Sequence, residues 1–334
     1  GRLLDRGVKV TVSTDDPPFW QQWALWHDQA AAGGYGTRAP SAWGRTTGSS
    51  EVVVAVVDTG ITQHPDLDAR VVPGYDFIGL DDVAPFAGTN LQPLTANDGD
   101  GRDPDASDPG NWISQSEATG LGFFGDRPEC SATASNWHGT HVAGIIAAVQ
   151  GNGVGVSGAA PGVTVQPIRA VGKCGGYLSD IADAIRWAAG GTGPTLPAAN
   201  PTPADVINLS LGGAGTCEAG GYLQQAIDYA HAAGAVVVAA AGNGSGGSGF
   251  PVAGDADLGV QGTLPANCAH VVAVAAVGRD GARASYSNYG PEVDIAAPGG
   301  TVSANDPTAG ILSTFNGGTT KPGSPTYRSL AGTS

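Results

Sequence analysis

Continuous apolar runs and amphipathic runs alternate along most of the chain. The run EVVVAVVD at 51–58 is rich in β-branched residues, as expected for a strand that is buried on both faces. Helical spacing of apolar residues appears at 138–149, at 180–189, where Ser179 is a candidate N-cap, and at 222–234. Further apolar runs of strand length occupy 163–171, 205–211, 235–242, 270–277 and 293–299.

This alternation predicts an α/β fold, with a doubly wound and mostly parallel sheet that carries helices on both faces. Ligands of such sheets bind at the carboxyl ends of the strands. The stretch 75–137 is long, irregular and rich in Asp, Gly and Pro, and loops are expected at 191–203 and 244–264. The tryptophans at 20, 23 and 26 have a spacing that favours a short helix packed in the core over a carbohydrate- or membrane-binding surface.

Composition narrows the classes of function. The chain has 334 residues, enough for one substantial core, and a net charge of −15. That charge argues against binding to nucleic acid or to anionic membranes, because phosphate contacts need Lys and Arg. The sequence contains no apolar run long enough for a transmembrane helix.

Four cysteines form an even set without C-x-x-C spacing, which disfavours a zinc knuckle or a redox motif. Two disulfides in an oxidising compartment are the preferred interpretation, and four buried thiols are the alternative. Three connectivities are possible. We favour Cys130–Cys174 and Cys217–Cys268, because each bond then closes a loop between sequence neighbours.

Three polar residues stand at the ends of predicted elements. Asp58 ends the first strand, His138 begins a helix, and Ser334 follows a Gly-Thr pair. Each alone has an ordinary explanation: a turn-capping carboxylate, a helix-start histidine and a turn serine. His138 and His141 could also share a metal, as in a metallohydrolase, although Gly139 occupies the position where H-E-x-x-H requires Glu.

Taken together, the surrounding segments are far more specific. VAVVDTGI around Asp58, NWHGTHVAG around His138 and SLAGTS up to Ser334 resemble the signatures of the subtilisin-like serine peptidases, in that family's order. The resemblance covers nearly the whole chain, and KCGGYLSDIADAIRWAAG is similar to the secreted bacterial branch. It implies a secreted, monomeric serine endopeptidase that acts on proteins or peptides through an acyl-enzyme and needs no cofactor for its chemistry.

The resemblance also assigns roles in catalysis. Ser334 would be the nucleophile, His138 its base, and Asp58 the group that holds the imidazole and stabilises its charged form. Asn243, in AAAGNG, would donate to the oxyanion beside the backbone N–H of Ser334. The alternative for Asn243 is a turn residue that tolerates a left-handed backbone.

The segment SLGG at 210–213 matches the family's substrate-binding strand, to which an extended peptide could add. Small residues in the walls of the expected pocket favour a large apolar or aromatic side chain before the scissile bond. These candidate substrate-binding residues are Ser210, Leu211, Gly212, Ala240, Ala241 and Gly242.

Structural calcium is expected in two regions. In the first, Asp16 and Asp66 match family positions that share one ion with the loop after the His138 helix. That loop would offer the side chain of Asn152 and the carbonyls of Val149, Val154 and Val156. It is one residue longer than the subtilisin pattern, and DTGITQHPDL is one residue shorter.

The second region is the acidic stretch NDGDGRDPDASD, which contains Asp98, Asp100, Asp103, Asp105 and Asp108; the first three are the candidate ligands. Hard oxygen ligands on a loop suit calcium, although the spacing is not that of an EF-hand. The alternative is an acidic loop that is simply solvated.

The chain departs from the family pattern at its ends. Family members continue after the nucleophile with Met-Ala-x-Pro and a long buried helix, so we expect that C-terminal helix to be missing and the 1–334 fragment to be inactive. Residues 1–15 are interpreted as a pro-segment remnant or N-terminal extension, and 16–334 as an incomplete peptidase domain. A catalytically inactive calcium-binding or adhesion module is the alternative function.

Overall fold

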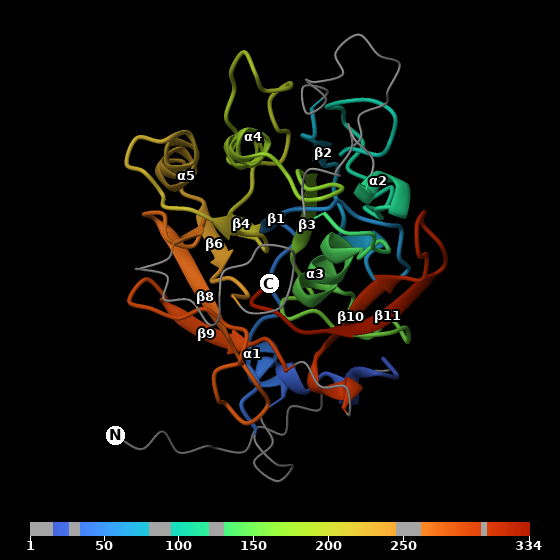
Figure 1. The fold of residues 1–334 in the computed structure, drawn as a ribbon. Helices are drawn as coiled ribbons and strands as arrows, with labels where there is room; N and C mark the ends of the chain where they lie inside the picture. The colour runs from blue at the N-terminus through green and yellow to red at the C-terminus, as the bar shows by residue number, and fades with distance from the viewer. Residues whose placement is uncertain (1–15, 27–33, 80–94, 120–129, 245–261, 302–305) are drawn as a thin grey trace.

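A sheet of seven parallel strands forms the centre of the computed structural model, which describes residues 16–26, 34–79, 95–119, 130–244, 262–301 and 306–334 (Figure 1). From one edge to the other, the strands are β2 (Tyr75–Asp76), β3 (Thr164–Arg169), β1 (Val53–Asp58), β4 (Val206–Leu209), β6 (Val236–Ala240), β8 (Val271–Val277) and β9 (Ile295–Pro298). The order changes direction at β1, as in a doubly wound sheet, and this confirms the predicted fold class.

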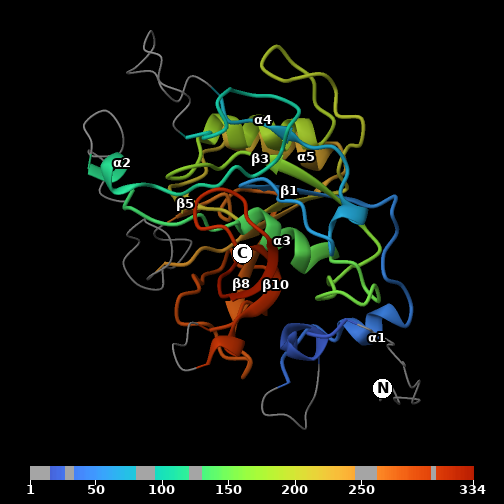
Figure 2. The same cartoon turned by 90° about the vertical axis from the view of Figure 1, so that its right-hand side faces the viewer.

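Helices lie on both faces of the sheet (Figure 2). Helices α4 (Leu178–Ala188) and α5 (Tyr222–Ala232) cover one face and enclose the larger part of the core. Helix α3 (His138–Ala147) covers the opposite face over β1 and β3, where Val54 and Val56 are buried. No helix among the described residues covers that same face over β6, β8 and β9, and the side chains of Val236 and Ile295 are 48% and 57% exposed there.

An antiparallel hairpin stands apart from the main sheet. It consists of β10 (Ile311–Asn316) and β11 (Pro325–Leu330), packs against α3 and leads to Ser334 (Figure 1). The sequence pattern did not predict it, because ILSTFN and PTYRSL mix polar and apolar residues without a clean alternation. The remaining elements are β5 (Gly213–Ala214), which pairs with β7 (Thr263–Leu264), and the short helices α1 (Ala39–Trp43) and α2 (Gln115–Thr119).

Three local predictions were wrong. The tryptophan segment forms two 3₁₀ turns, Phe19–Gln21 and Trp23–Leu25, and Trp20 is 74% exposed, although it stacks on Trp26. Helix α4 begins earlier than expected, so its N-cap residue is Tyr177, without a side-chain cap, instead of Ser179. The stretch 75–137 is not wholly irregular, since it contains β2 and α2.

Two disulfides join the four cysteines. They connect Cys130 to Cys174 and Cys217 to Cys268, with Cα–Cα distances of 5.4 and 5.0 Å. This is the pairing favoured from the sequence. Among the described residues, no helix is long and apolar enough to cross a membrane.

Candidate active site

Asp58 and His138 meet at the carboxyl end of the central strand. Asp58 ends β1 and is 2% exposed, and His138 opens α3 on the face above it. The Nδ1 atom of His138 lies 2.9 Å from each carboxylate oxygen of Asp58. The backbone N–H of Thr59 donates to Asp58 Oδ1 at 2.7 Å. This carboxylate therefore holds the imidazole with Nδ1 protonated, which leaves Nε2 available as a base.

A buried tryptophan fixes the start of helix α3. Trp137 is fully buried, has a φ of 49° and donates from its indole N–H to the carbonyl of Gly318 at 2.7 Å. Gly318 follows β10 in the hairpin, so this hydrogen bond connects the hairpin to the residue that precedes His138. Sequence reasoning missed this contact because the hairpin itself was not predicted.

The pKa of His138 is raised by its neighbours. Burial alone would lower this pKa, but the negative charges of Asp58 and Asp108 and the hydrogen bond to Asp58 outweigh it. Stabilisation of the protonated ring is what a general base needs when it takes a proton from a hydroxyl.

The ring of His141 is hydrogen-bonded to the hairpin. Its Nε2 atom lies 3.1 Å from the Ile311 carbonyl and 3.0 Å from the Arg328 carbonyl, so this ring is bonded to the hairpin. Burial lowers the pKa of His141 to about 4, which keeps the ring neutral. Within the described residues, no three His, Cys, Asp or Glu side chains are arranged to hold a metal ion. These contacts of His141 do not support the alternative of a metallohydrolase that uses His138 and His141.

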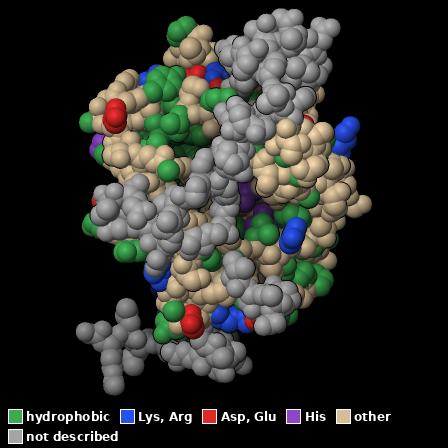
Figure 3. All heavy atoms as spheres, viewed as in Figure 1, with side chains coloured by type: hydrophobic (Ala, Val, Ile, Leu, Met, Phe, Trp, Pro, Cys, Tyr) green, Lys and Arg blue, Asp and Glu red, His purple; other side chains and the backbone are tan. Residues whose placement is uncertain are grey.

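Ser334 lies beside the predicted substrate strand. Its hydroxyl donates to the carbonyl of Ser210 at 3.2 Å, just past the end of β4. Histidine side chains are visible in a hollow at the centre of this face, near the place where Figure 1 shows the C-terminus (Figure 3). In this arrangement the Ser334 hydroxyl is directed to the Ser210 carbonyl and not to His138, and hydrogen bonds of this kind are often long or poorly aligned in sites without substrate.

The side chain of Asn243 is oriented by Thr333. Its Oδ1 atom accepts from the Thr333 backbone N–H at 2.9 Å and from the Thr333 hydroxyl at 3.0 Å. That hydroxyl in turn accepts from the backbone N–H of Gly242 at 3.1 Å, and Gly242 has a φ of +102° that only glycine adopts easily. With Oδ1 occupied, the amide N–H₂ is left for the space beside Ser334. The sequence identified Asn243 but not Thr333.

The two predicted walls of the substrate site lie on neighbouring strands. Residues 210–212 follow β4, and residues 240–242 end and follow β6, which pairs with β4. Asn288 donates to the Ala241 carbonyl at 2.9 Å and thereby fixes the second wall. Of the loop expected at 244–264, residues 245–261 lie outside the described residues, and Thr263–Leu264 form β7.

The first predicted calcium region contains two buried carboxylates. Asp16 and Asp66 are 1% and 0% exposed, and both face the loop after α3. Asp16 accepts from the backbone N–H groups of Gly151 and Asn152, and Asp66 accepts from the Asn152 amide at 2.9 Å and the Val156 N–H at 2.8 Å. Burial raises the pKa of Asp66 to about 6, and the charge of Asp16 adds to the effect.

This region offers the oxygen ligands that a hard cation prefers, but both oxygens of Asp16 and of Asp66 accept from neutral N–H or O–H groups, and Asn152 Oδ1 accepts from the Val154 N–H. Two buried carboxylates face one loop, and no positively charged side chain within the described residues forms an ion pair with either. The structure brings the predicted loop to both of them, although the Val154 side chain is 38% exposed. Loop carbonyls beside the carboxylates would complete an all-oxygen shell.

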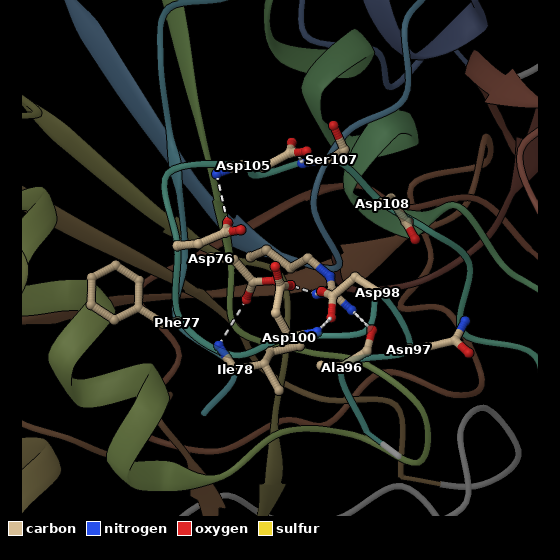
Figure 4. A network of polar contacts seen from close by, with 12 residues as sticks. Asp76, Phe77, Ile78, Ala96, Asn97, Asp98, Asp100, Asp105, Ser107 and Asp108 are labelled. Carbon is tan, nitrogen blue, oxygen red and sulfur yellow. Dashed lines mark hydrogen bonds and ion pairs between the residues drawn. The ribbon is translucent and has the colours of Figure 1, made fainter. Parts of the chain in front are cut away.

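The second predicted calcium region is built differently. Arg169, which is 1% exposed, pairs with Asp76 and Asp98 and donates to the Ala96 carbonyl. Figure 4 shows these three partners in one network of polar contacts. A cavity of about 370 Å³ lies beside this group. Its lining residues include Asn97, Asp98, Asp100, Asp103, Asp105, Trp112 and Lys321. The arginine therefore supplies positive charge that the first region lacks.

Known proteins similar to this chain are peptidases. The family model described as "Subtilase family" matches residues 49–334. The chain is 46% identical over 331 residues to an extracellular protease of Xanthomonas campestris and 40% identical to an extracellular basic protease of Dichelobacter nodosus. In each case 99% of the chain is covered, and it spans about half the length of these curated relatives, 48% and 47%.

A solved structure agrees with these relatives. A protease from Pseudoalteromonas arctica has 47% sequence identity and a TM-score of 0.79, with 96% of this chain and 82% of that chain covered. The family model, the relatives and the solved structure therefore agree with one another. They also agree with the sequence, in which Asp58, His138 and Ser334 stand in the order of the family's signature segments. The chain belongs to the subtilase family.

Proposed function

We propose that the protein is a secreted serine endopeptidase in which Ser334, His138 and Asp58 form the catalytic triad. The observation that carries the proposal is the contact of His138 Nδ1 with both oxygens of Asp58, because it fixes the tautomer and aims Nε2 outward. The extracellular proteases among the relatives and the two disulfides support secretion.

The residues define the sequence of steps. His138 Nε2 takes the proton of Ser334 Oγ as that oxygen attacks the scissile carbonyl carbon and forms a tetrahedral intermediate. Asp58 stabilises the imidazolium, which then gives its proton to the leaving amine as the acyl-enzyme forms. Water, deprotonated by the same ring, hydrolyses the ester.

Asn243 and the backbone N–H of Ser334 would stabilise the oxyanion. Because Thr333 occupies Oδ1 of Asn243, the amide N–H₂ is held in place before substrate binds. Preorganised donors cost no reorganisation during the reaction, and removal of one such donor from the related enzyme subtilisin lowers kcat by about 10²–10³.

The substrate would be an extended segment of a protein or peptide. It would pair with residues 210–212 as an added strand and place a large apolar side chain between that segment and 240–242. The small side chains and glycines of both walls support this preference.

Calcium would serve stability and not chemistry. Asp16, Asp66, the Asn152 side chain and carbonyls of Val149, Val154 and Val156 would hold one ion. A second ion, bound more weakly because Arg169 is close, would lie at Asp98, Asp100 and Asp103.

A fluorophosphonate probe tests the proposed function. The protein expressed from its full-length gene should be labelled on Ser334, as located by peptide mapping, and His138→Ala should abolish the label. An Asn243→Ala variant should keep the label but lose about a hundredfold in kcat toward a peptide substrate. Folded protein without label at Ser334 would overturn the proposal and favour an inactive binding module.

A further inference from the structure

We infer that Asp108 is a positioning residue for the catalytic pair and acts through the hydroxyl of Thr59. The inference rests on the proposed peptidase function and adds to it a second buried carboxylate behind Asp58 and His138. Asp108 lies in the acidic stretch, where sequence reasoning connected it only with calcium. In the structure its carboxylate bonds to Thr59 and Gly110 and not to Arg169, although the positive charge of Arg169 still acts on its pKa, which burial raises to about 6.

The carboxylate of Asp108 is buried, and each of its two oxygens accepts a hydrogen bond. The residue is 2% exposed, its Oδ2 atom accepts from the Thr59 hydroxyl at 2.8 Å, and its Oδ1 atom accepts from the Gly110 N–H at 2.8 Å. The backbone holds it in place, because Asp108 N–H donates to the Ile61 carbonyl at 2.9 Å and Ile61 N–H donates to the Ala106 carbonyl at 3.0 Å.

Thr59 connects this carboxylate to both members of the catalytic pair. Its backbone N–H donates to Asp58 Oδ1 at 2.7 Å, and its hydroxyl oxygen accepts from the Gly139 N–H at 3.0 Å. Gly139 follows His138 in the first turn of α3, where N–H groups have no partner within the helix. Since the hydroxyl has one proton, donation to Asp108 obliges it to present a lone pair to Gly139.

The chain of contacts therefore runs from Asp108 through Thr59 to the backbone that carries the base. A parallel contact, from Thr62 N–H to the Thr140 hydroxyl at 2.9 Å, joins the same two segments one residue further along α3. The close approach leaves no room for a side chain at residue 139, since a Cβ there would lie 2.2 Å from the Gly60 carbonyl oxygen.

The charge of Asp108 also acts on the imidazole. The titratable groups that face His138 are Asp58 on β1, Asp108 in the loop that pairs with Ile61, and His141 on α3. Both carboxylates raise the pKa of His138. Removal of the negative charge of Asp108 should therefore lower the pKa of His138 and move the acidic limb of the kcat/KM profile to lower pH.

The test compares Asp108→Asn with Asp280→Asn in protein expressed from the full-length gene. Asparagine offers one acceptor where the carboxylate offers two, so either Thr59 or Gly110 loses its partner. We expect kcat to fall about tenfold per titrated active site, KM to stay within about twofold, and the acidic limb to shift down by about half a pH unit. Asp280 is an exposed carboxylate in the turn after β8 and should leave all three quantities unchanged.

Variants at Thr59 test the route. Thr59→Val should lower kcat as much as Asp108→Asn does, and Thr59→Ser should restore it, because serine keeps the hydroxyl. Titration of active sites with the fluorophosphonate counts only folded enzyme, so poor folding cannot imitate the result. A kcat and pH profile of Asp108→Asn equal to those of Asp280→Asn would overturn the inference, as would a fully active Thr59→Val. An unlabelled wild-type protein would instead refute the peptidase proposal itself.

Discussion

The two acidic regions differ in how their buried carboxylates are compensated. Asp16 and Asp66 are met by backbone N–H groups, an asparagine amide and the Ser157 hydroxyl, all of them neutral donors. In the second region, Arg169, a permanent cation within the fold, pairs with the buried Asp76 and with Asp98, which is exposed.

This difference bears on where the protein depends on an external cation. A buried carboxylate without a charged partner carries the cost of desolvation until a cation arrives. One that is paired with a buried arginine has a cation beside it at every calcium concentration, although burial outweighs Arg169 and raises the pKa of Asp76 to about 8. The first region should therefore respond to chelators, and the second should respond to loss of its arginine.

The largest effect is expected from Arg169→Met. It leaves Asp76, 1% exposed, without its cation and should lower the free energy of unfolding by about 3–5 kcal/mol. Denaturant unfolding at pH 8 measures the loss. Arg102→Met is the matched control, because Arg102 also pairs with two carboxylates, Asp180 and Asp183, but its side chain is 24% exposed. Equal losses in the two variants would show that burial of the arginine does not matter.

Calcium removal should have the next largest effect. If the ion binds only the folded state, calcium at a hundred times its Kd stabilises by about 2.7 kcal/mol, and EDTA removes this contribution. The Asp66→Asn variant should unfold at the same temperature with and without calcium, as followed by circular dichroism. A variant that still gained full stability from calcium would place the ion elsewhere.

Protonation of Asp66 gives a smaller, pH-dependent effect in EDTA. Its folded-state pKa of about 6 lies above the ordinary value of 3.8, so its contribution to stability is complete below pH 3.8 and is lost as pH rises through 6. Between pH 7 and pH 5 the free energy of unfolding of wild type should rise by about 1 kcal/mol relative to Asp66→Asn. Parallel pH curves for the two proteins would contradict the raised pKa.

The smallest effect is expected from Asp100→Asn. Asp100 is exposed beside the cavity, and Arg169 already compensates its neighbour Asp98. The gain in Tm that calcium produces should change by less than about 1 °C, as followed by circular dichroism. A loss as large as that of Asp66→Asn would make the two acidic regions equivalent in their need for calcium.

The central sheet was predictable because its strands are buried on both faces. Runs such as EVVVAVVD signal a strand without any knowledge of their partners, and the β1, β6 and β8 positions follow from composition alone. The hairpin of β10 and β11 was not predictable, because its burial does not follow residue type: the polar residues Ser313, Thr314 and Asn316 of β10 are buried, and β11 is only partly buried. Trp20 was misassigned because regular spacing does not reveal whether a face has a partner.

In the site, signature segments identified residues but not the contacts that orient them. Asp58, His138 and Asn243 stand in recognisable motifs, whereas Thr333, Thr59 and Asp108 act through hydrogen bonds between segments distant in sequence. Asp108 and Thr59 are 49 residues apart along the chain, and no pattern of spacing relates them. The arginine that distinguishes the two acidic regions lies on β3, far along the chain from the acidic stretch that it compensates.

The short connection after the hairpin joins two mechanical halves of the active site. On one side, hydrogen bonds from Ser313 and Thr314 to α3 hold the hairpin to the helix that carries the base. On the other side, Gly332 bonds to Gly299 and Thr333 to Asn243, so Ser334, the proposed nucleophile, is attached to the side of Asn243, the proposed oxyanion donor. The distance between Ser334 and His138, the proposed nucleophile and base, therefore depends on how these two halves are placed relative to each other. A force that shifts the hairpin should slow proton transfer from the serine and leave oxyanion donation as it was.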